Sequence, residues 1–160
     1  MQIDRRGFLA GASATLASTG LPSFANVAAE KEETLSVAAI GHTGRGNFGH
    51  GLDTVWLHNS DTQVVAAADP DERGLAAELK KLKIDRGFAD YRKMLAEVRP
   101  EIVAVCPRHA DQHRDMVVAC AEAGVKGVYI EKPFCRTPAE GDQIKAACDK
   151  NNVKLAVAHR

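Results

Sequence analysis

With 160 residues, the chain is long enough for one domain with a hydrophobic core and too short for two. Lys plus Arg and Asp plus Glu each total 21, and hydrophobic residues make up 45%, which is typical of a soluble globular protein. This balance of charge excludes an electrostatic argument for binding nucleic acid or an anionic membrane, so any partner has to be argued from a site.

The first 29 residues are arranged like an export signal. The pair Arg5-Arg6 precedes an uncharged run over residues 10–21, and small residues at 27–29 come before an acidic stretch. The run is short and rich in Gly, Ser and Thr, which makes it too weak for a comfortable membrane span. Paired arginines followed by Phe-Leu resemble a twin-arginine signal, whose translocase exports proteins that have already folded.

This pattern divides the chain into three parts. We expect a twin-arginine signal peptide at residues 1–29, a linker at 30–34 and one folded domain at 35–160. The expected location is periplasmic, or otherwise outside the cytoplasm. Two alternatives stay open: a disordered tail that happens to carry two arginines, and an uncleaved signal that remains as an anchor.

From residue 35 onward, apolar runs typical of buried strands alternate with stretches of helical periodicity. The predicted strands cover residues 35–40, 63–68, 86–88, 102–106, 125–130 and 155–158. The predicted helices have apolar faces at residues 52–56, 75–82, 94–98, 116–121 and 144–148. Gly124 is placed to end one helix, and Thr137-Pro138-Ala139-Glu140 matches a capping box that begins the next. Six strands joined by helices predict the α/β class, as a Rossmann-type doubly wound parallel sheet covered on both faces.

The cysteines indicate no metal or redox motif. None of Cys106, Cys120, Cys135 and Cys148 stands in a CxxC pair, so zinc-ribbon and thioredoxin-like sites have no support. We interpret them as small apolar side chains that are mostly buried. Pairing of two of them in an oxidising compartment stays open.

A glycine-rich loop joins the first predicted strand to the first predicted helix. Glycines let backbone N–H groups at a helix start approach a pyrophosphate. Gly44, Gly46 and Gly49 match GxGxxG literally. A register that begins at Gly41 instead places Thr43 and Gly46 at the second and third glycine positions. The second register fits the strand end better, so we expect Gly41, Gly44 and Gly46 closest to phosphate; a turn without a ligand is the alternative.

Asp69 follows the second predicted strand, 23 residues after Gly46. A carboxylate there can accept hydrogen bonds from both hydroxyls of an adenosine ribose, and it would repel a 2′-phosphate. The position therefore predicts NAD rather than NADP. The competing interpretation is a turn or helix-capping acid beside Pro70.

Further polar residues lie at predicted strand ends, where ligands bind in open parallel sheets. The segment from Pro107 to His113 follows the fourth strand, and Glu131-Lys132-Pro133 follows the fifth. His109 and His113 are four residues apart, but Pro107 makes a regular helix at His109 doubtful and no further ligand completes a metal site. We expect no metal, and a role for His113 in lining the cleft or capping a helix.

These elements resemble the Gfo/Idh/MocA family of oxidoreductases. The resemblance is carried by Glu131-Lys132-Pro133 after an apolar strand, and by the glycine-rich loop, Asp69 and the segment from Pro107 to His113 in matching order. It spans residues 35–160 and corresponds to that family's N-terminal cofactor domain. It implies reversible hydride transfer between a nicotinamide and a carbinol carbon of a sugar, inositol or related polyol.

The same resemblance implies roles for individual residues. Lys132 would approach the nicotinamide and the substrate hydroxyl, where its ammonium can stabilise developing alkoxide charge. Glu131 would orient Lys132, and Pro133 would hold a cis or otherwise fixed bend. The predicted catalytic residues are Lys132 and Glu131. The predicted cofactor-binding residues are Gly41, Thr43, Gly44, Arg45, Gly46, Asp69, Pro107, His113, Glu131 and Lys132.

Members of that family carry a second, mostly antiparallel domain that supplies substrate contacts, and the sequence stops around where it would begin. We therefore expect the C-terminal α+β substrate domain to be absent from this chain. Two hypotheses follow: the cofactor half of an exported NAD-dependent oxidoreductase, or a truncated, non-catalytic dinucleotide-binding module. A Rossmann methyltransferase has less support, because Glu-Lys-Pro has no evident role there. A sugar or polyol partner requires that a substrate domain is supplied, and homo-oligomers are a further possibility.

Overall fold

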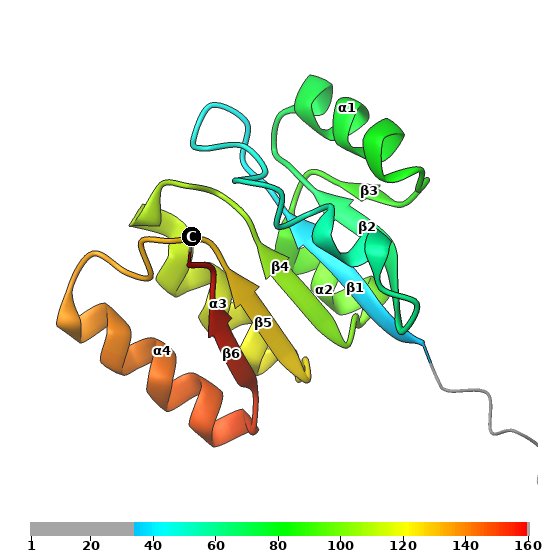
Figure 1. Ribbon diagram of the computed structural model, residues 1–160. Helices are drawn as coiled ribbons and strands as arrows, with labels where there is room; N and C mark the ends of the chain where they lie inside the picture. The colour runs from blue at the N-terminus through cyan, green and yellow to red at the C-terminus, as the bar shows by residue number, and fades with distance from the viewer. Residues whose placement is uncertain (1–33, 160) are drawn as a thin grey trace, which may run out of the picture. The chain divides into compact units, whose positions relative to one another are not determined.

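The computed structural model describes residues 34–159, which contain a six-stranded parallel sheet (Figure 1). The strands are β1 Leu35–Ile40, β2 Thr62–Ala68, β3 Gly87–Phe88, β4 Ile102–Val105, β5 Gly127–Ile130 and β6 Lys154–Val157. The helices are α1 Glu72–Leu82, α2 Tyr91–Val98, α3 His113–Glu122 and α4 Pro138–Asn151, with short 3₁₀ helices η1 Val55–His58 and η2 Ala110–Gln112. The predicted signal peptide, most of the predicted linker and Arg160 lie outside the described residues.

The strand order is β3-β2-β1-β4-β5-β6, and every neighbouring pair is parallel. The chain therefore winds outward twice, first from β1 to β3 and then from β4 to β6. The direction reverses between β1 and β4, whose last residues Ile40 and Val105 are paired. The predicted doubly wound α/β sheet is confirmed.

Two apolar layers hold helices against the sheet. On one face, Ile40, Val105 and Ile130 belong to a cluster that includes buried residues of α2, α3 and α4. On the other face, Val37 and Ala39 belong to a cluster with residues of α1 and of the loop after β1. Residues 37–40 are almost wholly buried, which explains why β1 is a continuous apolar run and does not alternate. Figure 1 shows α3 and α4 side by side, with α1 beside β2 and β3.

The predicted helix at residues 52–56 is wrong. The segment contains turns and only the short helix η1. Gly44, Gly46, Gly49 and Gly51 all have positive φ, between +68° and +97°, and Asn47 has φ of 53°. Backbone in that region cannot belong to a right-handed α-helix, so the chain turns repeatedly before η1.

Because that helix is missing, the second face of the sheet is covered unevenly. Of the described helices, α1 and η1 pack there, against β2 and β3. Over β5, Trp56 meets Tyr129 edge to face at 6.0 Å, and Ala156 on β6 is exposed. The sheet is thus covered on both faces, as predicted, with less helical cover over β5 and β6 on this second face.

The predicted end of α3 and start of α4 are confirmed, but Glu140 binds a different backbone N–H from the one that a capping box uses. Thr137 accepts a hydrogen bond from the N–H of Glu140 at 3.2 Å, and Pro138 is the first helical residue of α4. Glu140 reaches back to the N–H of Arg136 at 2.9 Å and not to that of Thr137. Gly124, with φ of +78°, follows the end of α3.

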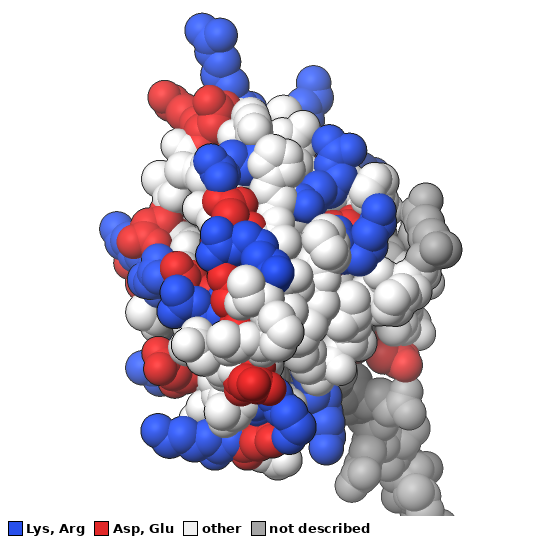
Figure 2. Space-filling model, turned by 90° about the vertical axis from the view of Figure 1, so that its left-hand side faces the viewer, with Lys and Arg blue, Asp and Glu red and all other residues white. Residues whose placement is uncertain are grey.

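The surface agrees with the balanced composition. On the side of the molecule shown in Figure 2, basic and acidic side chains are interspersed, and pairs such as Lys145 with Asp149 lie along α4. Within residues 34–159, no helix combines the length and the apolar character that crossing a membrane requires. All four cysteines are free thiols, and three of them are buried, as predicted.

Candidate functional site

The site lies where the strand order reverses, at the carboxyl ends of the strands. The N–H of Gly41 donates to the carbonyl of Ala68 at 2.8 Å, and the N–H of Cys106 donates to the carbonyl of Ile40 at 2.9 Å. The segments that follow β1, β2 and β4 therefore start side by side. This is the crevice in which doubly wound sheets bind ligands.

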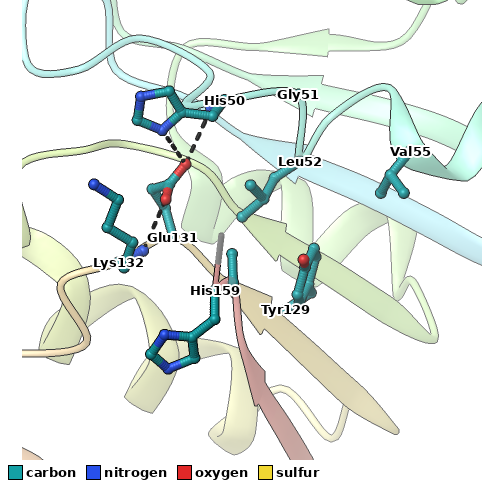
Figure 3. A pocket seen from close by; sticks show the side chains of 9 residues that line it. His50, Gly51, Leu52, Val55, Tyr129, Glu131, Lys132 and His159 are labelled. Atoms are coloured by element: carbon teal, nitrogen blue, oxygen red, sulfur yellow. Dashed lines mark hydrogen bonds and ion pairs between the residues drawn. The ribbon is translucent and has the colours of Figure 1, made fainter.

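Two cavities open along this edge. The β2–β3 cavity has a volume of about 180 Å³ and is lined by Gly41, His42, Ala68, Asp69, Pro70, Ala89, Asp90, Tyr91, Gln112 and Met116. The β5–β6 cavity has a volume of about 300 Å³ and is lined by His50, Gly51, Leu52, Val55, Tyr129, Glu131, Lys132, Ala158 and His159 (Figure 3). The segment after β1 contributes residues to both.

The glycine-rich loop, residues 41–49, is folded onto itself. His42 and Asn47 exchange backbone hydrogen bonds of 3.2 and 3.0 Å, and the N–H of Arg45 donates to the carbonyl of His42 at 3.0 Å. The N–H of Gly44 donates to Oδ1 of Asn47 at 3.0 Å. The predicted cradle at a helix start is therefore not formed in this structure, because several of its N–H groups bind within the protein and no α-helix follows.

Asp69 lies where the sequence predicts it, but its carboxylate is 1% exposed. The N–H of Thr43 donates to both of its oxygens, at 2.9 and 3.1 Å, and the Thr43 hydroxyl donates to Oδ2 at 2.8 Å. The N–H of Asp71 donates to Oδ1 at 2.9 Å. Asp69 thus acts as a turn acid in this structure, while Asp71 caps α1 by accepting from Gly74 at 2.7 Å.

The segment after β4 closes onto the glycine-rich loop. Arg45 forms an ion pair with Asp111, His42 Nδ1 donates to Gln112 Oε1 at 2.6 Å, and Arg108 Nε donates to the carbonyl of Gly46 at 3.3 Å. Gly46 must be a glycine here, because a Cβ on it would lie 2.2 Å from the backbone nitrogen of Arg108. Gly44, by contrast, has no atom within 4 Å of such a Cβ. Of the three glycines expected near phosphate, Gly44 is thus the most open.

His113 joins two loops and does not line either cavity. Its ring is fully buried, with Nε2 2.7 Å from the carbonyl of Pro107 and Nδ1 3.2 Å from the carbonyl of Phe134. Both ring nitrogens therefore face protein carbonyls and not His109. Of the two roles expected for His113, lining the cleft or capping a helix, the buried ring does not fulfil the first in this structure. Pro107 contacts His113 through its carbonyl oxygen.

Glu131 makes a different contact from the one predicted. It is 1% exposed, and its Oε2 accepts from the backbone N–H of His50 at 3.0 Å and lies 2.9 Å from His50 Nδ1 (Figure 3). Its Oε1 accepts from the backbone N–H of Lys132 at 2.9 Å, so it fixes the main chain of Lys132 and not the ammonium. Burial raises the pKa of Glu131, but hydrogen bonds from His50 and Lys132 outweigh burial, and the pKa is lowered. The Lys132–Pro133 bond is cis, as the fixed bend predicts.

Sequence reasoning missed a buried carboxyl pair beside the glycine-rich loop. Asp53 and Glu78 are 1% and 4% exposed, and Lys81 forms an ion pair with each. Burial, with a hydrogen bond to Asp53, raises the pKa of Glu78 to about 8, although Lys81 lowers it. With Thr43 and Phe48, these three side chains line a groove of about 560 Å³. The Glu78–Lys81 spacing on α1 was visible in the sequence, but Asp53 fell in the helix that does not form.

The sequence and the fold of this chain are similar to those of known proteins. Residues 35–159 match the family model described as "Oxidoreductase family, NAD-binding Rossmann fold". Over 114 residues the chain is 31% identical to D-apiose dehydrogenase of Paraburkholderia graminis, covering 71% of this chain and 30% of that protein.

Two solved structures have the same fold. A probable dehydrogenase from Thermotoga maritima is 25% identical with a TM-score of 0.68, covering 78% of this chain and 36% of that one. An oxidoreductase from Agrobacterium radiobacter, in complex with NAD+, L-tartaric acid and magnesium, is 21% identical with a TM-score of 0.67, covering 77% and 34%. The chain thus spans about a third of the length of these relatives. It belongs to the Gfo/Idh/MocA family of oxidoreductases and corresponds to the family's NAD-binding Rossmann domain.

Proposed function

We propose that this chain binds NAD as the cofactor half of an oxidoreductase that acts on a sugar, inositol or related polyol. The observation that carries the proposal is the pair of cavities on either side of the reversal of strand order, with Asp69 at one and Lys132 at the other. The relatives support the substrate class, since one is a D-apiose dehydrogenase. The alternative is a non-catalytic dinucleotide-binding module.

The linings of the two cavities suit the two ends of a dinucleotide. In the β2–β3 cavity, Ala68 and Met116 provide apolar surface, Tyr91 an aromatic ring, and Asp69 a carboxylate for ribose hydroxyls. A 2′-phosphate near Asp69 would meet like charge, which favours NAD over NADP. The β5–β6 cavity is lined by Lys132, which carries an ammonium group, and by the ring of Tyr129.

Within the β5–β6 cavity, the chain's own residues prepare Lys132 for charge stabilisation. The Glu131 carboxylate accepts a hydrogen bond from the N–H of Lys132 and holds its main chain. Its ammonium can then stabilise negative charge that develops on a substrate hydroxyl oxygen as its proton leaves. NAD, when bound, supplies the nicotinamide carbon that accepts or returns a hydride.

The test is titration of the full chain with NADH and with NADPH, followed by nicotinamide fluorescence. We expect NADH to bind, NADPH to bind more weakly, and Asp69→Asn to narrow the difference between them. Lys150→Met, at an exposed position on α4, is the control and should leave binding unchanged. Lack of NADH binding by the unmodified chain would refute the proposal.

Turnover separates the two hypotheses. The chain is incubated with NAD and a panel of sugars and polyols, and nicotinamide absorbance is followed. Reduction that Lys132→Met abolishes and Lys150→Met retains supports an enzyme. NADH binding without any turnover supports the module.

We also propose that the chain is exported through the twin-arginine pathway and acts in the periplasm or another compartment outside the cytoplasm. The proposal is carried by the sequence of residues 1–29 alone.

A further inference from the structure

The carboxylate of Asp69 is already occupied, although it lies at the cavity that suits an adenosine. Thr43 supplies two donors to it, a backbone N–H and a hydroxyl, at 2.8–3.1 Å. A ribose supplies two hydroxyl donors to the same kind of carboxylate. We propose that Thr43 takes the place of the ribose hydroxyls on Asp69, so that it competes with the adenosine half of the dinucleotide and sets the affinity. This inference rests on the proposed function.

The protein is shaped to hold Thr43 in that position. Gly74, in the first turn of α1, leaves the space that Thr43 fills, because a Cβ on Gly74 would lie 1.9 Å from the Thr43 hydroxyl oxygen. Glycine is unfavourable inside a helix by about 1 kcal/mol relative to alanine. Position 74 therefore carries glycine, which helix formation disfavours, and this glycine leaves room for the Thr43 side chain.

The same loop is held from its other side. His42 bonds Gln112, Arg45 pairs with Asp111, and Arg108 bonds the carbonyl of Gly46. These contacts join the loop after β1 to the segment after β4 across the crevice. A ligand that reaches Asp69 has to displace Thr43 while the loop stays tethered at these points.

The exchange conserves hydrogen bonds at Asp69, which is why the closed form can compete. In either form the buried carboxylate keeps donors to both oxygens, so neither form leaves a charge unpaired. The apparent affinity is then the intrinsic affinity reduced by the fraction of molecules in which Thr43 has left Asp69. Weakening the Thr43 contact should raise that fraction.

The test compares Thr43→Val with the unmodified full chain by titration calorimetry. Valine keeps the branched shape and the backbone N–H but lacks the hydroxyl donor. We expect NADH and ADP-ribose to bind about tenfold more tightly, in line with one hydrogen bond to a charged group. Nicotinamide mononucleotide, which lacks the adenosine half, should bind as before.

Two further variants separate this effect from a general change in the fold. Thr43→Ser restores the hydroxyl and should return the affinity for ADP-ribose to that of the unmodified chain. Thr54→Val removes a hydroxyl that donates to the carbonyl of Gly51 in the same region, and should leave the affinity for NADH and ADP-ribose unchanged.

The outcomes distinguish this inference from the proposed function. Equal or weaker binding of ADP-ribose by Thr43→Val, with measurable binding by the unmodified chain, overturns the inference and leaves NAD binding intact. Failure of both proteins to bind NADH overturns the function and the inference together.

Discussion

Gly49 is the position where the structure gives the sharpest prediction about stability. Its φ is +68°, and a Cβ built on it would lie 2.4 Å from the carbonyl oxygen of Cys106 and 2.8 Å from Glu131 Oε2. Both neighbours are fixed, since Cys106 follows β4 and the Glu131 carboxylate is held by His50 and Lys132. Gly49→Ala therefore cannot be accommodated by moving one flexible side chain.

The cost has two parts. A left-handed backbone costs an alanine about 1 kcal/mol relative to glycine. Overlap with fixed atoms in a packed region adds about 1–3 kcal/mol. We expect Gly49→Ala to lower the free energy of unfolding by about 2–4 kcal/mol. Gly44→Ala is the matched control: its φ is +81° but no atom lies within 4 Å of the new Cβ, so only the backbone cost applies.

The assay is urea unfolding of the full chain and both variants, followed by circular dichroism and analysed for the change in unfolding free energy. The difference between the two variants isolates the close approach at Gly49 from the cost of positive φ. Equal losses in the two variants, or a larger loss in Gly44→Ala, would show that Gly49 is not confined as described.

Two other predictions concern pH and export. The fold raises the pKa of Glu78 from 4.5 to about 8, so the uncharged carboxyl stabilises the fold fully below pH 4.5, and that contribution is lost as pH rises from 4.5 through about 8. Glu78→Gln should remove this dependence, and urea unfolding at about pH 5 and about pH 9 checks it; parallel losses in both proteins would contradict the shift. For export, replacing Arg5 and Arg6 by lysine should leave the precursor in the cytoplasm on fractionation of the source cells, and unchanged export would exclude the twin-arginine pathway.

Local sequence patterns predict most of the sheet because the strands are buried apolar runs. The first predicted strand coincides with β1, and the others differ from the observed strands by a residue or two at their ends. The end of α3 at Gly124 and the start of α4 at Thr137 follow equally from local residues. In each case the determining groups are neighbours in the chain.

The parts that sequence reasoning missed depend on distant contacts. Apolar spacing at Leu52 and Trp56 predicts a helix. The N–H groups of Thr54 and Val55 instead bind the carbonyl of Gly51 in turns, and just before them the N–H of His50 binds a carboxylate 81 residues away. The position of Asp69 was predictable from its place after β2, whereas its pairing with Thr43 required the folded loop. The proximity of Asp53 and Glu78, which both pair with Lys81, also required the folded structure, because Asp53 lies in the turns before η1 and Glu78 lies on α1.

The carboxylate of Glu131 has a consequence for the order of ligand binding. It ties His50 to the main chain of Lys132, so two walls of the β5–β6 cavity are joined before any ligand arrives. The conformational entropy of these groups is therefore lost during folding, and their ordering adds no cost when a ligand binds. At the β2–β3 cavity, Thr43 has to leave before a ligand can pair with Asp69. We expect a nicotinamide group to enter at a rate set by encounter, and an adenosine group at a rate set by the departure of Thr43.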